Sequence, residues 1–142
     1  MTERCCRIPR LIDQWDAEGD HERVIGVIES LPQVKRGYHT QLRLARSLIA
    51  VGRHGYALTV LTEQHGRGND DPLWHRMMGS ALSGMSRWEE AEEHLLRAIS
   101  LDSDDPETWR LLVAVYRDGI SDQEGLEECL QRLTELESRE KP

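Results

Sequence analysis

The sequence predicts an all-α fold, a right-handed α-solenoid of about four helical hairpins. The first observation is a 34-residue period that runs from residue 38 to about residue 137. Two columns of the repeat show it: Leu44, Met78 and Leu112, and then Ala57, Ala91 and Gly125. A period of this length with small residues at fixed places is typical of arrays of helix-turn-helix repeats.

Capping residues at matching places of successive repeats are the second observation. Asp71 and Asp105 each stand before a proline, the arrangement of an N-cap followed by the first helical position. The segments 86–89 and 121–124 have the Ser-x-x-Glu pattern of a capping box. Together with apolar residues three and four positions apart, these signals predict eight helices. Their expected ranges are 8–17, 21–31, 38–51, 54–65, 72–84, 87–100, 106–118 and 121–138.

The repeats predict one domain that spans residues 1–142. It consists of a degenerate unit at 5–36, regular repeats at 38–71, 72–105 and 106–138, and a tail at 139–142. The first unit is degenerate because Ile12 and Val24 stand where the later repeats have small residues. Small residues such as Gly79 and Ala91 are expected to face each other and bring two helices close together. No single hairpin can bury its apolar face alone, so neighbouring hairpins must stack.

The segment 72–105 resembles a tetratricopeptide repeat. It matches that repeat at Gly79, Leu82, Trp88, Ala91, Leu95, Ala98, Leu101 and Asp102. It departs from it at Trp74, which lies one place early, and at Ser103, which replaces the usual proline. The resemblance extends over nearly the whole chain and includes small stand-alone bacterial tetratricopeptide proteins. It implies a scaffold or chaperone-like module that binds proteins and performs no chemistry.

Composition narrows the classes of partner. Residues 1–86 carry a net charge of +1 and residues 87–142 a net charge of −9, which sum to −8. This acidic balance argues against nucleic-acid binding, which needs a basic surface. The longest apolar runs are far too short to cross a membrane, and the polar N-terminal segment does not resemble a secretory signal. We therefore expect a cytoplasmic protein with reduced cysteines.

The sequence gives no sign of an enzyme, a cofactor or a metal site. The three cysteines lack the spacing of a zinc site, and no two histidines have the i, i+4 spacing of a helical metal pair. The segment 65–68 contains two glycines but lacks the Lys-Ser/Thr that follows in a phosphate-binding loop. Cys129, in an apolar column, is expected to be a small core residue.

The resemblance also suggests a binding surface, because in this family the first helix of each hairpin lines a concave groove. The residues expected there are Arg46, Arg76, Arg110, Arg117, Ser80 and His39. An arginine can hold a carboxylate through two parallel N–H donors, so we expect an acidic peptide or a C-terminal carboxylate as ligand. The alternative is that these arginines pair with carboxylates of neighbouring helices.

Trp74 is expected to be the partly exposed aromatic residue of this groove, where it would anchor a partner. The carboxylate clamp of some family members is not supported, because that clamp needs an asparagine on a first helix. The single asparagine of this chain, Asn69, falls in a joint between helices.

A second hypothesis is a structural protein that associates with itself, for instance as a homodimer. The apolar residues at the two ends of the array could then stack between chains. They are Cys5, Cys6, Ile8 and Leu11 at one end and Leu126, Leu130 and Leu133 at the other.

Overall fold

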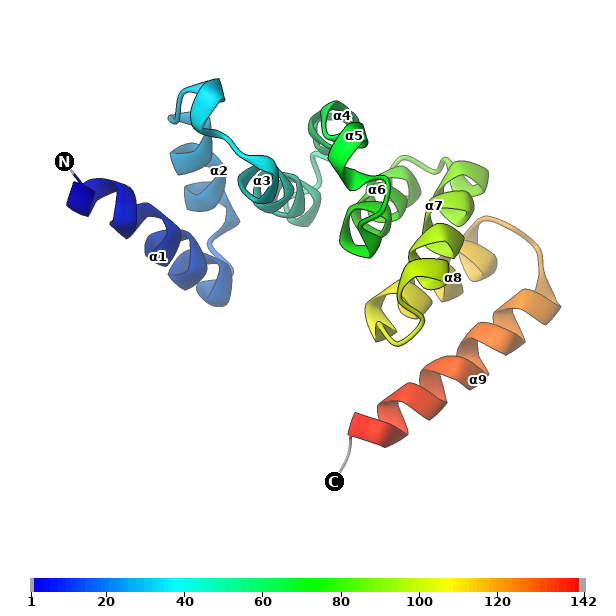
Figure 1. The fold of residues 1–142 in the computed structure, drawn as a ribbon. Coiled ribbons are helices and arrows are strands. Elements are labelled where there is room, and N and C mark those ends of the chain that lie inside the picture. Colours follow the sequence, from blue (N-terminus) through cyan, green and yellow to red (C-terminus); the bar gives the residue numbers. More distant parts are fainter. Residues whose placement is uncertain (1, 141–142) are drawn as a thin grey trace. The chain divides into compact units, whose positions relative to one another are not determined.

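The structure is a computed structural model that describes residues 2–140, with side chains for residues 9–139. Every regular element in this range is a helix and no strand occurs (Figure 1). The predicted all-α class is therefore confirmed. The chain divides into two compact units at Gln64 and His65, and each unit is described by itself.

The first unit contains two helical hairpins joined by a short irregular segment. Its elements are α1 (Thr2–Glu18), α2 (His21–Glu29), η1 (Gln33–Lys35, a 3-10 helix), α3 (Tyr38–Ala50) and α4 (His54–Glu63). Helix α1 packs against α2, α2 against α3 and α3 against α4. The core consists of side chains with no exposed surface, among them Val24, Ile28, Leu44, Leu48 and Leu61.

The second unit contains two more hairpins. Its elements are α5 (His65–Gly68), α6 (Pro72–Gly84), α7 (Trp88–Leu101), α8 (Pro106–Asp118) and α9 (Gln123–Glu140). Helix α6 pairs with α7 and α8 with α9, while α7 packs against α8. Within the residues described, none of the helices is long and apolar enough to span a membrane.

The aspartate caps lie where the sequence predicts them. The Asp71 carboxylate accepts a hydrogen bond from the backbone N–H of Leu73 at 3.0 Å, and Asp105 accepts one from Glu107 at 3.1 Å. Each aspartate thereby satisfies one of the backbone donors that the first turn of a helix leaves without a partner. Helices α6 and α8 accordingly begin at the two prolines, Pro72 and Pro106.

The two predicted capping boxes are wrong. Ser86 has a φ of 60° and ends the turn after α6, so Arg87 becomes the N-cap of α7 without a side-chain bond. At the start of α9, the Asp122 carboxylate accepts the N–H of Gly125 at 3.0 Å. Asp122, rather than Ser121, therefore accepts the backbone hydrogen bond at the first turn of α9.

The joints between hairpins also differ from the prediction. Two short elements, η1 and α5, occupy segments expected to be irregular, and α1 begins six residues earlier than expected, at Thr2 rather than residue 8. Both short elements lie in joints between the predicted helices, so the helical periodicity gave no signal for them.

Gly79 allows the close approach of α6 and α7. A Cβ atom at Gly79 would lie 2.5 Å from Cγ of Leu95, which has no exposed surface. Leu95 thus occupies the space above Gly79, where the sequence suggested Ala91, a residue that is itself fully buried. The column of small residues is explained by such contacts between a helix backbone and a large side chain.

We predict that Gly79→Ala destabilises the protein by about 1–3 kcal/mol, because the added methyl group overpacks the contact with Leu95. The matched control is Gly26→Ala in α2, where a Cβ atom would meet nothing within 4 Å. That change is expected to stabilise by about 0.5–1 kcal/mol, since alanine favours a helix over glycine. Urea unfolding measures both effects, and equal shifts for the two variants would contradict the packing described.

Candidate functional site

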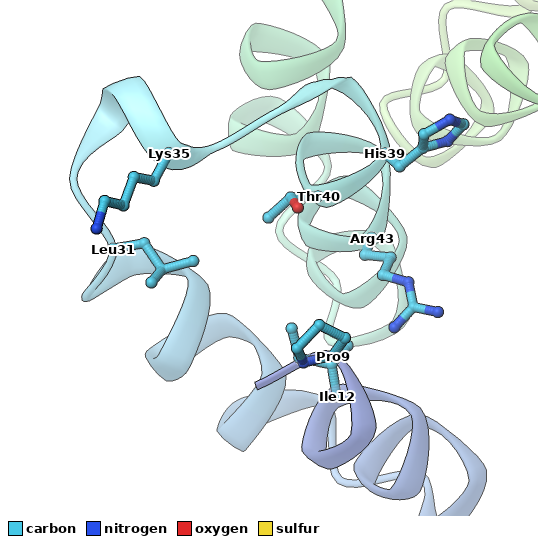
Figure 2. Close-up of a pocket in the computed structure, with 7 residues that line it drawn as sticks. All are labelled: Pro9, Ile12, Leu31, Lys35, His39, Thr40 and Arg43. Atoms are coloured by element: carbon cyan, nitrogen blue, oxygen red, sulfur yellow. The ribbon is translucent and has the colours of Figure 1, made fainter. Parts of the chain in front are cut away.

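The first unit has an open cavity of about 350 Å³ between α1, the segment that follows α2, η1 and α3. Figure 2 shows Leu31 and Lys35 on one side, Thr40 and Arg43 on the other, and residues of α1 between them. The lining residues are Pro9, Ile12, Leu31, Lys35, His39, Thr40 and Arg43. The cavity therefore combines apolar side chains from α1 and from the segment after α2 with basic side chains from η1 and α3.

The segment 31–36 forms one wall of this cavity, and Arg36 holds that segment in place. Its Nε donates to the carbonyl oxygen of Leu31 at 3.1 Å, and its Nη2 donates to that of Glu29 at 2.8 Å. Glu29 is the last residue of α2, where backbone acceptors lack helical partners, and Leu31 follows the C-cap Ser30. The positions of Leu31 and Lys35 thus follow from a side chain that caps the preceding helix.

A basic stripe runs along one face of α3 at the cavity. We define it as His39, Arg43 and Arg46, whose spacing of four and then three residues places them on one side of a helix. Arg43 forms an ion pair with Asp13 of α1. Arg46 is exposed and makes no ion pair with any described side chain, so its charge is available to a partner.

His39 and Arg46 were among the predicted site residues, whereas Lys35 and Arg43 were not. The resemblance pointed to the repeat positions that face a groove, and Lys35 lies in a joint outside the repeats. The positive charges of Lys35, in the joint before α3, and of Arg43 and Arg46, on α3, were the sequence signal that could have identified the cavity and the basic stripe. Val34, which precedes Lys35 in this joint, is an apolar residue with 93% of its surface exposed.

The predicted arginines of the second unit are all paired with carboxylates. Arg76 bonds to Asp105 at 2.6 Å, and Arg117 bonds to its neighbour Asp118 at 3.1 Å. Arg110 contacts Glu107 at 2.5 Å and Glu137 at 3.1 Å. Their charges are thus partly neutralised, which is the alternative that the sequence left open. Their role in partner binding stays a prediction.

The Arg76 pair differs from the others because it connects two helices and is partly shielded. Only 27% of the Arg76 side chain and 24% of the Asp105 side chain are exposed. Asp105 is also the N-cap of α8, so Arg76 reaches from α6 to the start of α8. A charge held in this way contributes to the packing of the unit.

Two other predicted residues of this unit have different environments. Ser80 of α6 is half-buried, and Arg117 borders a second cavity of about 350 Å³ at the α8–α9 turn. That cavity is lined by Tyr116, Arg117, Ser121, Asp122, Gln123 and Leu126. Its lining contains one cation and one carboxylate, so it has no net preference for an acidic ligand.

The expectation that Trp74 is partly exposed is wrong, because only 1% of its surface is accessible. Helix α5 covers it, and a Cβ atom at Gly68 would lie 2.2 Å from the indole ring. Three imidazole rings lie in T-shaped arrangements with the indole, with centroids 4.8–5.7 Å away: His65, His75 and His94. Trp74 therefore belongs to the core and offers no anchor to a partner.

Two of these histidines form a defined hydrogen-bonded pair. Nε2 of His75 lies 2.8 Å from the carbonyl oxygen of Asn69, and its Nδ1 lies 3.1 Å from Nδ1 of His94. A carbonyl only accepts, so Nε2 of His75 carries a proton. In the neutral pair, Nδ1 of His75 then accepts a proton from Nδ1 of His94. The pair links the segment before α6 to α7.

Burial lowers the pKa of His94, and the nearby His75 and His65 lower it further, while Glu90 acts in the opposite direction. Cys129 of α9 is buried, as the sequence predicted, and burial raises the pKa of its thiol to about 11. This thiol is therefore protonated at neutral pH and a poor nucleophile. No group of three or more metal-ligating side chains occurs among residues 9–139.

Comparisons with known proteins identify relatives in structure alone. No protein-family model matches the chain, and no curated protein matches it. MamA from Desulfovibrio magneticus RS-1, residues 41 to the end, has a TM-score of 0.78 at 18% identity and covers 95% of this chain and 76% of that chain. The fold is of the tetratricopeptide type.

Two further solved structures with this tetratricopeptide-type fold agree. The MamA RS-1 ArsTM double mutant has a TM-score of 0.77 at 18% identity, with 94% of this chain and 75% of that chain covered. MamA from MSR-1 has a TM-score of 0.72 at 17% identity, with 88% and 72% covered. At such identities the likeness establishes the fold, and the function must be argued from the residues of this chain.

We predict that the protein loses stability as the pH falls below about 6.5, in part because of His94. Its pKa is lower in the folded than in the unfolded state, so the unfolded chain binds more protons in this window. The stability is complete above the unfolded pKa of about 6.5 and decreases on acidification. Urea unfolding at pH 7.5 and 5.5 should show a smaller decrease for His94→Gln than for wild type. The exposed control His39→Gln should decrease as wild type does, and the same decrease in all three proteins would contradict the prediction.

We also predict that Arg76→Ala lowers the free energy of unfolding by about 1–3 kcal/mol, since it leaves a partly buried carboxylate without its charged donor. Arg87→Ala is the control, because its pair with Glu90 at 2.7 Å is exposed on one helix. That variant should change stability by less than about 1 kcal/mol. Equal thermal or chemical midpoints for the two variants would show that Arg76 is not structural.

Proposed function

We propose that this chain is a non-catalytic interaction module that binds an acidic segment of a protein or peptide. The observation that carries the proposal is the basic stripe of α3 beside the apolar cavity of the same unit. Basic side chains attract and orient an acidic partner, whereas buried apolar contacts supply most of the affinity. Both kinds of surface occur here within the first unit.

The second unit supports the proposal less strongly. Arg76 is engaged in a partly buried pair, and Trp74 lies in the core. Arg110 and Arg117 keep 44% and 64% of their side chains exposed, so they could accept an additional carboxylate from a partner. We therefore centre the proposed binding surface on Arg46, His39 and Arg43 of the first unit, and Ser80, Arg110 and Arg117 of the second unit stay separate candidates for contact with a partner.

The chemistry of the site fits binding better than catalysis. The thiol of Cys129 is buried and protonated, and the buried pair His75 and His94 bonds to a backbone carbonyl and to itself. Neither group is arranged with a nucleophile and an acid-base partner at an open site, as catalysis requires. A reducing, cytoplasmic location would keep the free thiol of Cys129 in this state.

Exposed leucines favour self-association as the second candidate function. Leu11 of α1 is 37% exposed and Leu130 of α9 is 45% exposed, whereas Leu126 and Leu133 are half-buried. The side chains of Cys5, Cys6 and Ile8 lie outside the described residues. Sedimentation velocity over a hundredfold range of concentration tests this candidate, with Leu130→Asp as the variant expected to remain monomeric. A monomer at every concentration would exclude it.

The main proposal predicts that Arg43→Ala/Arg46→Ala weakens binding of a fluorescent acidic peptide by about tenfold, a change of about 1.4 kcal/mol. The probe is a twelve-residue peptide with alternating Glu and Leu, compared with the same peptide carrying Gln in place of Glu. Binding should also weaken with added salt, because exposed charges are screened over about 8 Å at physiological ionic strength.

The matched control is Arg53→Ala/Arg97→Ala, which removes the same charge from exposed positions outside the stripe. Its affinity for the acidic peptide should stay within about twofold of wild type, as for charges at the rim of an interface. If both double variants bind as wild type does, or if the Gln peptide binds equally well, the basic stripe is not the binding surface.

A further inference from the structure

We propose that helix α5 is a cover over Trp74 that opens when the imidazole rings of His75 and His94 take up protons. With the cover closed, Trp74 lies in the core and offers nothing to a partner. With the cover open, at mildly acidic pH, the indole and the apolar surface beneath α5 become accessible. The cover lies in the second unit and does not depend on the basic stripe, so the inference goes beyond the proposed function.

The cover lies directly on the indole ring. Helix α5 has only four residues, His65–Gly68, and a Cβ atom at Gly68 would lie 2.2 Å from Cγ of Trp74. The backbone of α5 is therefore in contact with the ring. A helix of one turn has little stability of its own, because nucleation of a helix is unfavourable. The position of α5 consequently depends on its contacts with the rest of the second unit.

A chain of hydrogen bonds through the two histidines holds the end of the cover. In the neutral pair, Nε2 of His75, on α6, donates to the carbonyl oxygen of Asn69, the residue that follows α5. Nδ1 of His75 accepts a proton from Nδ1 of His94, on α7, at 3.1 Å. The ring centroids are 5.3 Å apart, so the rings meet nearly end to end through these nitrogen atoms. Both rings also contact the indole of Trp74.

There is room for only one proton between the two Nδ1 atoms. A first added proton can bind to Nε2 of His94 and leave the hydrogen bond between the rings intact. A second proton, on Nδ1 of His75, would place two N–H donors and two positive charges opposite each other, so the rings must separate. Because only 4% of His75 is exposed, its charged ring must then move towards water, which breaks its bond to Asn69.

The surroundings of the pair oppose protonation of the closed form. Burial lowers the pKa of His94, and His75 and His65 lower it further. Glu90 acts in the opposite direction, but Nε and Nη2 of Arg87 hold its carboxylate at 3.0 and 2.7 Å. The attraction between Glu90 and a charged His94 is thereby weakened. Protons consequently bind more tightly once the rings reach water, and acid favours the open form.

The other charged side chains around the pair are engaged elsewhere. Asp70 of the joint pairs with Arg97 of α7 at 3.9 Å, and both side chains are exposed, so this pair contributes little to holding α5. Arg76 of α6 reaches Asp105, and the carboxylate of Asp71 caps α6. Helix α8 contributes none of the charges that act on the histidine of α7. The histidine pair is therefore the acid-sensitive link between α5 and the unit.

The experiment measures amide hydrogen exchange of the whole ¹⁵N-labelled protein at pH 7.5 and 5.5, corrected for the intrinsic exchange rates. The reporters are the backbone N–H groups of Asn69 and Asp71, which bond to carbonyl oxygens of α5, and the controls are those of Asp102 and Gly119. Each histidine that binds its proton only in the open form contributes up to about tenfold over this interval, so opening at the reporters should rise about tenfold to hundredfold. Opening at the controls should rise about threefold or less, because it is local to other helix ends.

Exposure of the indole is the second readout. The N–H signal of Trp74, assigned with Trp74→Phe, should be broadened by a soluble nitroxide at pH 5.5 and not at pH 7.5. The indole N–H of Trp109, which bonds to the carbonyl oxygen of Ser103, is the internal control. Its broadening should be the same at the two pH values.

A matched pair of glycine variants tests the cover itself. Gly68→Ala inserts a methyl group against the indole, so it should expose Trp74 already at pH 7.5. Gly66→Ala lies in the same helix, where a Cβ atom meets nothing within 4 Å, and should behave as wild type.

Histidine variants test the link. His75→Gln/His94→Gln removes both titrating rings but keeps side chains that donate and accept, so the rise at the reporters should fall to about twofold or less. His39→Gln, an exposed histidine of the first unit, should keep the rise of wild type. If the double variant does not fold, His94→Gln takes its place, with an expected rise clearly below that of wild type.

A rise confined to the reporters, with parallel exposure of Trp74 and loss of both in the histidine variant, would support the inference. Reporters that exchange freely at pH 7.5, or equal effects of Gly68→Ala and Gly66→Ala, would show that α5 does not cover the indole. Equal rises at reporters and controls would indicate general acid unfolding, and a full rise in the histidine variant would place the sensor elsewhere. Each of these results overturns the inference and leaves the proposed function of the basic stripe untouched.

Discussion

Contact between the backbone of one helix and a large side chain of its neighbour is the constraint on which the packing of the second unit depends. Gly79 lies against Leu95, and Gly119 lies against Trp88, where an added Cβ would be only 2.1 Å from the ring. These positions accept no larger residue because protein interiors are packed without free space. The contacts fix the distance between the helices, and that distance determines which side chains reach the surface.

This constraint explains why the hairpins could be predicted from the sequence and the joints could not. Columns of small and large residues repeat every 34 positions, and Asp71 and Asp105 mark helix starts by local chemistry. The joints depend on contacts that no repeat encodes, such as the bonds from Arg36 back to Leu31 and Glu29. Trp74 shows the same limit, since its burial results from α5, a four-residue helix without periodic signal.

Charge pairing was equally hard to predict, for a related reason. The repeat positions of Arg76 and Arg110 indicated a helix surface but did not reveal which carboxylates lie within reach. Asp105 and Glu137 are 29 and 27 residues away in sequence and become neighbours only through helix packing. Some of the carboxylates of residues 87–142 therefore form ion pairs with arginines of the second unit. These arginines are less available to a partner than their number suggests.

The candidate site arises at the place where the repeat is least regular. Ile12 corresponds to Ala45 in the next repeat, which is a fully buried small residue, and this isoleucine instead forms part of the apolar floor of the cavity. The irregular segment 31–36 adds Leu31 and Lys35, which a regular repeat would not place there. Departures from a local pattern without a gain in stability often mark a functional site. Of the two residues that replace small ones in this unit, Ile12 lines the cavity, whereas Val24 is fully buried in the core, so only the substitution at residue 12 bears on the proposed site.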